Sequence, residues 1–154
     1  MRVLGLDTST TSTGYAVLDN GKLICYGSIK PPAKISVFEK IILIEKEIKE
    51  IIKKKKVEYI IIEDLAVTRS ANTTKVLAGL LYHLIIEFTK QELLTITVRP
   101  SQWRANSGIK GKKREELKQN AINHVREIYN LDVNDDEADS ICIAEYSNKL
   151  NVEE

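Results

Sequence analysis

Hydrophobic and polar positions follow two periodicities along this chain, and each periodicity predicts a different kind of secondary structure. Short apolar stretches bounded by turn or charged residues predict five β-strands, at residues 2–7, 13–18, 22–29, 57–63 and 94–98. Apolar residues that recur every three or four positions predict helices at residues 36–56, 72–90, 112–129 and 136–148. The expected order is three strands, then alternating helices and strands, then two helices.

Local signals favour the same arrangement. Asn20-Gly21 favours a tight hairpin, so the first three strands are expected to form an antiparallel meander. Ser36 and Glu39 form a capping box that opens the first helix. Residues 59–62 are continuously apolar, which is typical of a central strand covered on both faces. The pattern predicts an α/β protein with a mixed five-stranded sheet flanked by helices, in a single domain over residues 1–154.

Composition narrows the class of protein. The chain has 154 residues, 43% of them hydrophobic and 29% charged, as is ordinary for a soluble domain. Cys25 and Cys142 are isolated, so a disulfide framework or a zinc site is not expected. The N-terminal residues lack the apolar core of a signal peptide, and no apolar run has the length of a membrane span. We therefore expect a soluble cytoplasmic protein with no membrane partner.

The net charge is only +1, but the charges are unevenly distributed. Residues 129–154 contain eight acidic residues and one basic residue. Residues 99–118 contain seven basic residues against two acidic ones. The basic residues of this segment are Arg99, Arg104, Lys110, Lys112, Lys113, Arg114 and Lys118. A basic segment followed by an acidic one suits a protein that binds a polyanion and holds cations beside it. Two solvated faces of opposite charge are the simpler alternative.

Four acidic residues occupy positions where an acid is costly. Asp7 and Glu63 each follow a continuously apolar strand, so an unpaired carboxylate there would lie close to the core. Asp136 and Asp139 are three residues apart at a helix start and share one face of that helix. Each acid alone has an ordinary explanation, such as capping a loop or interacting with the helix dipole. Four such acids, on two strands and one helix, together favour a metal site.

Oxygen ligands of this kind are what Mg²⁺ prefers. Two such ions about 3.5–4 Å apart can catalyse phosphodiester hydrolysis, and holding them requires several converging carboxylates. The two histidines, His83 and His124, are expected to be ordinary helix residues. Residues 8–14 are rich in hydroxyl groups but lack the pattern of a P-loop.

The sequence resembles the RuvC family of Holliday-junction resolvases, in order and over nearly the whole chain. The matching segments are Gly5-Leu6-Asp7, Thr13-Gly14-Tyr15-Ala16-Val17, residues 60–63, the basic segment from Trp103 to Arg114, and residues 136–144. Asp132 and Asp135 also form an acidic pair three residues apart. The resemblance favours Asp136 and Asp139 instead, because only Asp139 directly precedes a small residue and an apolar helical run.

The resemblance implies an RNase H-like fold and a structure-selective endonuclease that nicks Holliday junctions and other branched DNA. It implies that Asp7, Glu63, Asp136 and Asp139 are catalytic and bind two Mg²⁺ or Mn²⁺ ions. It also implies that a basic residue near Lys113 faces the scissile phosphate, and Lys113 itself is the expected catalytic cation. The expected DNA-binding residues are Arg69, Arg104, Lys110, Lys112, Lys113 and Arg114.

Two departures distinguish this chain from cellular members of the family. Thr8-Ser9 stands where those members carry Pro-Gly, and residues 64–70 contain no aromatic side chain. An aromatic wedge that unstacks bases is therefore not expected. The chain looks more like phage-type members, which are less strict toward branched DNA and would act in the host cytoplasm.

Two other functions fit parts of the pattern. Leu4-Gly5-Leu6-Asp7-Thr8-Ser9-Thr10 also resembles the first strand of the actin, sugar-kinase and threonylcarbamoyladenosine superfamily, which would make the chain a nucleotide-binding domain. Those proteins need two such domains and do not need Glu63 or the paired aspartates. A non-catalytic DNA-binding module would use only the basic segment and would leave the acids unexplained.

A homodimer is expected from symmetry, because one chain supplies one metal site and a four-way junction offers two symmetric strands. The helix at 72–90 has more apolar surface than one core face needs and is the expected interface. Leu81, Tyr82 and Ile86 carry the excess beside Leu77, Leu80 and Leu84.

Overall fold

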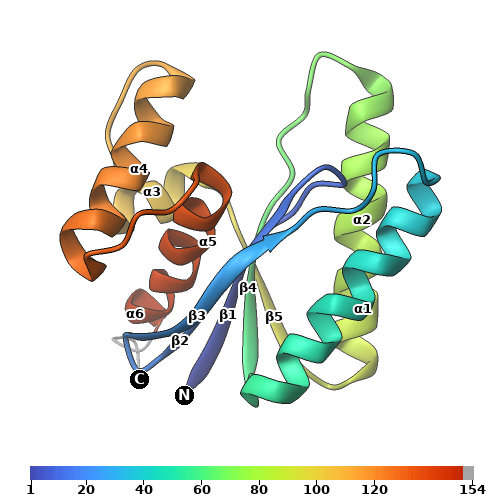
Figure 1. Ribbon diagram of the computed structural model, residues 1–154, viewed down its shortest axis with the longest axis horizontal. Coiled ribbons are helices and arrows are strands. Elements are labelled where there is room, and N and C mark those ends of the chain that lie inside the picture. The colour runs from blue at the N-terminus through green and yellow to red at the C-terminus, as the bar shows by residue number, and fades with distance from the viewer. Residues whose placement is uncertain (151–154) are drawn as a thin grey trace.

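The computed structural model describes residues 1–150 and contains one five-stranded sheet in the order β3-β2-β1-β4-β5 (Figure 1). The strands are β1 (Arg2–Asp7), β2 (Thr13–Asp19), β3 (Lys22–Ile29), β4 (Tyr59–Glu63) and β5 (Leu94–Val98). The first three strands pair antiparallel, whereas β4 pairs parallel with both β1 and β5. The predicted mixed sheet is confirmed; of the single domain expected over residues 1–154, the last four residues lie outside the described residues.

Helices cover both faces of the sheet, as Figure 1 shows. The helices are α1 (Val37–Lys55), α2 (Ala71–Lys90), α3 (Pro100–Ser107), α4 (Arg114–Tyr129), α5 (Asp135–Glu145) and α6 (Ser147–Leu150). Helices α1 and α2 lie on one face, and α3 to α6 lie on the other. The capping box predicted at Ser36 and Glu39 is present and begins α1.

The alternation of side chains along each strand divides the core into two layers. In β1, Leu4 and Leu6 belong to the apolar cluster under α1 and α2. Val3 belongs to the cluster under α3, α4 and α5. Asp7 follows Val3 in steps of two, so it faces the second set of helices. The same alternation in β4 places Glu63 on that face, because Tyr59 and Ile61 belong to the same cluster.

Two glycines allow α5 to lie unusually close to the sheet. A β-carbon on Gly5 would be 2.6 Å from the backbone nitrogen of Ala144, which is closer than real β-carbons come. A β-carbon on Gly14 would be 2.6 Å from the carbonyl carbon of Asp136. Any other side chain at these positions would push α5 away from β1 and β2. The glycines thus set the distance between the acids of α5 and Asp7.

The helices differ from the prediction in three places. Helix α3 was not predicted, because Pro100 suggested only the end of a strand; here it is the first residue of a helix, where its missing N–H is no loss. The helix predicted at 112–129 begins at Arg114, after an extended Lys113. The helix predicted at 136–148 is two helices, α5 and α6.

The predicted interface helix also needs a correction. Leu81 is buried in the protein's own core, packed in the cluster under α1 and α2, so it is not available to a partner. Tyr82 and Ile86 are exposed as predicted. Phe38 and Ile42 on α1 are exposed as well. A hydrogen bond between Glu45 and His83 and an ion pair between Lys49 and Glu87 join the two helices side by side.

Cys25 and Cys142 are both free thiols. Among residues 1–150, none of the helices combines the length and the apolar character needed to cross a lipid bilayer.

Candidate active site

Asp7 and Glu63 lie next to each other at one edge of the sheet. They follow Leu6 and Ile62, which are paired in the parallel ladder between β1 and β4. Because the carboxyl ends of parallel strands meet at the same edge, the two acids project side by side from the same face. The apolar residues before them explain why both strands remain in the core up to that point.

Asp136 and Asp139 complete the acidic group from α5. Asn134 caps this helix by accepting a hydrogen bond from the Glu137 backbone, and the Glu137 side chain accepts one in return. The cap fixes where the helix starts and therefore which acids turn toward the sheet. Asp136 and Asp139 both line the cavity above Asp7, whereas Asp132 lies in the preceding loop, paired with Arg126. The predicted choice of acidic pair agrees with this placement.

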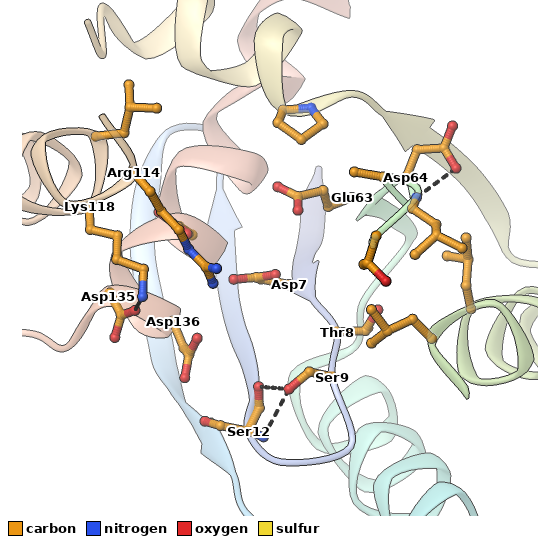
Figure 2. Close-up of a pocket in the computed structure, with 18 of the residues that line it drawn as sticks. Asp7, Thr8, Ser9, Ser12, Glu63, Asp64, Arg114, Lys118, Asp135 and Asp136 are labelled. Atoms are coloured by element: carbon orange, nitrogen blue, oxygen red, sulfur yellow. Dashed lines mark hydrogen bonds and ion pairs between the residues drawn. The ribbon is translucent and has the colours of Figure 1, made fainter. Parts of the chain in front are cut away.

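These acids line one cavity of about 530 Å³. Figure 2 shows Asp7, Glu63 and Asp136 directed into the same space, with Thr8, Ser9 and Ser12 along one wall. The hydroxyl-rich segment seen in the sequence therefore borders the site.

Burial and mutual repulsion make these carboxylates unusually reluctant to ionise. Burial raises the pKa of Asp7 well above its ordinary value, and the neighbouring acids, Glu63 first, raise it further. Burial, and then the charge of Glu63, raise the pKa of Asp139 to about 7. Burial also raises the pKa of Glu63, against the hydrogen bond from Trp103 and the charge of Arg104. Closely spaced acids that repel one another need cations to hold them charged.

Trp103 and Arg104 approach the acids from α3. The Trp103 indole donates a hydrogen bond of 2.6 Å from Nε1 to Oε2 of Glu63. The Arg104 guanidinium lies over the Trp103 ring, with Cζ 5.1 Å from its centre, and Arg104 lines the cavity. The Nε of Arg104 is buried and has no hydrogen-bond partner within residues 1–150. The sequence drew attention to Arg104 but not to the role of Trp103.

Helix α4 supplies two further cations. Arg114 lines the cavity, and Figure 2 shows its side chain extending from α4 toward the space that the acids line. Lys118 also lines it and pairs with Asp135 at 2.8 Å. Asp135 and Lys118 were not among the predicted site residues. Their positions in the sequence could have indicated both residues, because Asp135 directly precedes Asp136 and Lys118 lies one helical turn after Arg114.

The other predicted DNA-binding residues lie outside the cavity. Lys113 is the N-cap residue of α4 and is exposed, as are Lys110 and Lys112 on the preceding loop. Arg69 is exposed on the loop between β4 and α2. These four residues are exposed on the surface and do not line the cavity.

The donor set fits hard divalent ions. All of the candidate ligands are carboxylate oxygens, which Mg²⁺ and Mn²⁺ accept. In the described part of the chain, the sets of three ligand atoms within 4.8 Å of one another lie elsewhere, at Glu45, His83 and Glu87 and at His124, Cys142 and Glu145. The four acids are thus spread more widely than either of these sets.

Both tighter sets are occupied by internal interactions. Glu87 is paired with Lys49 and Lys90. Glu145 is buried and accepts hydrogen bonds from Tyr129, Ser107 and His124. Burial would raise the pKa of Glu145, but these bonds lower it below its ordinary value. This network joins α3 and α4 to α5 and so supports the helices that carry the site.

The sequence profile of the family described as Lactococcus phage M3 protein matches residues 1–149. The chain belongs to this family. The chain is also similar to RuvC: the crossover junction endodeoxyribonuclease RuvC of Fusobacterium nucleatum is 25% identical over 147 residues, covering 93% of this chain and 77% of that protein. The resemblance predicted from the motifs is confirmed.

Two solved structures show that this member of the phage M3 family has the RuvC fold, which is RNase H-like. RuvC of T. thermophilus in complex with a Holliday junction substrate superposes with a TM-score of 0.80 at 18% identity, covering 99% of this chain and 96% of that one. Fowlpox virus resolvase with Holliday junction DNA gives 0.65 at 19% identity, covering 97% and 99%. The predicted fold class is confirmed.

Proposed function

We propose that this protein is a metal-dependent endonuclease that nicks Holliday junctions and other branched DNA by phosphodiester hydrolysis. The observation that carries the proposal is the cavity itself: Asp7, Glu63 and the aspartates of α5 converge there from three elements, beside two arginines. Similarity over 93% and 94% of this chain to two enzymes named crossover junction endodeoxyribonuclease supports the substrate class. Neither a nucleotide-binding domain nor a non-catalytic DNA-binding module would need this acidic group.

Asp7, Glu63, Asp136 and Asp139 would hold two Mg²⁺ or Mn²⁺ ions. When bound, the ions activate the attacking water and stabilise the leaving oxygen. The four carboxylates supply the negative charge that binds them. The raised pKa values of Asp7 and Asp139 fit this role, since bound cations would restore the charged forms.

The arginines at the cavity would bind the phosphate. Arg104 has an unpartnered buried Nε, and both Arg104 and Arg114 line the cavity, so both can donate hydrogen bonds to phosphate oxygens. Lys113 stays a prediction for the catalytic cation. Arg114 is the second candidate, because its side chain lines the cavity and that of Lys113 does not. Arg69, Lys110, Lys112 and Lys113 would bind the DNA backbone around the cavity.

A homodimer would place two such sites on one junction. Phe38 and Ile42 of α1 and Tyr82 and Ile86 of α2 form the candidate interface, here called the α1–α2 patch. All four side chains are more than half exposed, and large apolar side chains gathered on neighbouring helices mark an interaction surface. An isologous contact through this patch would give the two-fold symmetry that a four-way junction presents.

A nicking assay tests the proposal. Synthetic four-way, three-way and linear DNA are incubated with the protein, with Mg²⁺, with Mn²⁺ and with a chelator. Metal-dependent cleavage of the branched substrates, with little cleavage of linear DNA, is the expected result. Cleavage of all three DNAs at equal rates would support a nuclease but contradict its selectivity for branched structures. An enzyme with this activity on phage or host DNA would act in the host cytoplasm.

A further inference from the structure

Helix α3 brings a large buried side chain to the acidic group. Its first residue, Pro100, follows the end of β5, and β5 pairs with β4 so that Val98 lies opposite Glu63. The helix therefore starts beside the very strand end that carries Glu63. Trp103 then lies in the core, 1% exposed, and its indole N–H meets the Glu63 carboxylate.

We propose that Trp103 is a positioning residue for the metal site, which orients Glu63 and leaves one of its carboxylate oxygens for a metal ion. The inference rests on the proposed function, because it takes Glu63 to be a metal ligand. Trp103 does not contact the reacting atoms in this proposal. It acts through Glu63.

The chemistry of the indole group suits this task. Its N–H can only donate, so it cannot compete for a cation, and it does not titrate in the accessible pH range. The bond of 2.6 Å joins Nε1 to Oε2, which leaves Oε1 of Glu63 directed elsewhere. A neutral donor of this kind reduces the repulsion that Glu63 meets from the other acids without adding a positive charge that would repel a metal ion.

The surroundings of Trp103 make the orientation rigid. The ring belongs to the apolar cluster that includes Ile61, Ala138 and Ile141, so it is held by β4 and α5, the elements that also carry Glu63 and Asp139. Its face supports the Arg104 guanidinium while its edge binds Glu63. The Trp103 side chain thus contacts both Glu63, a proposed metal ligand, and Arg104, a cation that lines the cavity.

The experiment uses the fact that the chain contains a single tryptophan. Growth in a tryptophan auxotroph replaces Trp103 with benzothienylalanine, which has the same two-ring shape but a sulfur in place of the N–H. 5-Fluorotryptophan, which keeps the N–H, is the matched control.

Mn²⁺ binding to each protein, with junction DNA present, is measured from the free ion by electron paramagnetic resonance, without reference to cleavage. We expect benzothienylalanine to weaken Mn²⁺ binding by about 10–100-fold, as loss of a hydrogen bond to a metal ligand typically does. 5-Fluorotryptophan should leave it unchanged.

A second control separates this role from a general loss of stability. Tyr59→Phe removes the hydroxyl group of another buried residue, in the same apolar cluster and on the same strand as Glu63. It should lower the melting temperature without changing Mn²⁺ affinity. Wild-type Trp103 fluorescence should also be quenched by Mn²⁺, a paramagnetic ion, and the quenching should disappear in Glu63→Gln.

The outcomes distinguish the two proposals. Unchanged Mn²⁺ affinity in the benzothienylalanine protein, with affinity lost in Glu63→Gln, would overturn the role of Trp103 and leave the nuclease standing. If benzothienylalanine weakens Mn²⁺ binding but the wild-type protein cleaves no branched DNA, the positioning role of Trp103 would be supported and the proposed substrate overturned. Quenching by Mn²⁺ that survives in Glu63→Gln would place the ion away from this carboxylate and overturn the inference.

Discussion

The backbone of α5 lies against Gly5 so closely that a β-carbon there would be 2.6 Å from the nitrogen of Ala144 and 2.8 Å from its β-carbon. The neighbours are mainly backbone atoms, which cannot rotate away as a flexible side chain could. Gly5 lies two residues before Asp7 on the same face of β1, and Ala144 is on the helix that carries Asp139. The absence of a side chain at Gly5 therefore brings the two acids to one cavity.

Gly5→Ala should destabilise the protein by about 1–3 kcal/mol, the usual effect of overpacking a core. It should also reduce cleavage more than the loss of stability explains, because α5 must move away from Asp7. Chemical denaturation and a nicking assay measure the two effects.

Gly79→Ala is the matched control, since a β-carbon there meets nothing within 4 Å. In a helix this change should stabilise by up to about 1 kcal/mol. Normal cleavage by a folded Gly5→Ala protein would contradict the argument.

Asp139→Asn should abolish metal-dependent cleavage and leave junction binding largely intact, because it removes a proposed metal ligand without changing the shape of the side chain. The same result is expected for Asp7→Asn, Asp136→Asn and Glu63→Gln. Asp132→Asn is the control, because Asp132 lies in an exposed loop paired with Arg126. Gel shifts in a chelator and cleavage in Mg²⁺ separate binding from chemistry. An Asp139→Asn protein that cuts at the normal rate would remove Asp139 from the site.

Without metal, the protein should become less stable as the pH rises from about 4 to 7. The pKa of Asp139 is about 7 in the folded protein and close to 3.8 when unfolded, so the folded state binds the proton more tightly. Stability from such a group is present at low pH and is lost as the pH rises toward the folded pKa, by on the order of 1 kcal/mol per pH unit. Thermal unfolding in a chelator measures the slope.

A comparison of the wild type with Asp139→Asn isolates the contribution of Asp139 to this pH dependence. The raised pKa of His124 also makes stability fall as the pH rises, but it does so equally in both proteins. The variant should show a shallower loss of stability with rising pH. Adding Mg²⁺ should flatten the wild-type slope and leave the variant nearly unchanged. Identical slopes in the two proteins would mean that Asp139 is ionised without metal.

Binding of DNA should weaken steeply with salt, and each lost phosphate contact should reduce the slope of log affinity against log salt by about 0.9. Lys110→Ala with Lys112→Ala should lower the slope by about one to two while cleavage of bound DNA continues, because both side chains are exposed outside the cavity. Arg114→Ala should instead reduce the cleavage rate of bound junctions, since Arg114 reaches the cavity. Single-turnover cleavage at several salt concentrations tests both. A larger loss of rate from Lys113→Ala alone would assign the catalytic role to Lys113.

The α1–α2 patch should hold two chains together. Tyr82→Glu should shift the protein from dimer to monomer in sedimentation at micromolar concentration, because the charge would be buried at an isologous contact. The matched control is Ile128→Glu on α4, where the isoleucine is exposed to a similar degree, 59% against 64% for Tyr82. A wild-type monomer that still makes paired cuts would refute the dimer. A dimer that survives Tyr82→Glu would place the interface elsewhere.

Local information in the sequence was sufficient for most of the secondary structure. The strand at residues 94–98 has the predicted bounds, and the capping box at Ser36 starts its helix as expected. These features depend on neighbouring residues, such as alternation along a strand or a hydrogen bond across one helical turn. The acids Asp7 and Glu63 could be chosen for the same reason, because each directly follows an apolar strand.

Only the tertiary structure decided which side chains from distant segments share the cavity. The bond from Trp103 to Glu63 spans 40 positions, and neither residue's neighbours indicate it. The extended backbone at Lys113 places Arg114 at the start of α4, and the packing of that helix on α5 then brings Arg114 rather than Lys113 to the cavity. Leu81 and Tyr82 are adjacent residues with large, mainly apolar side chains, yet Leu81 is buried in the core and Tyr82 is exposed. The difference arises because the position of α1 determines which side of α2 is covered. Such relationships depend on the packing of whole elements, which no local pattern contains.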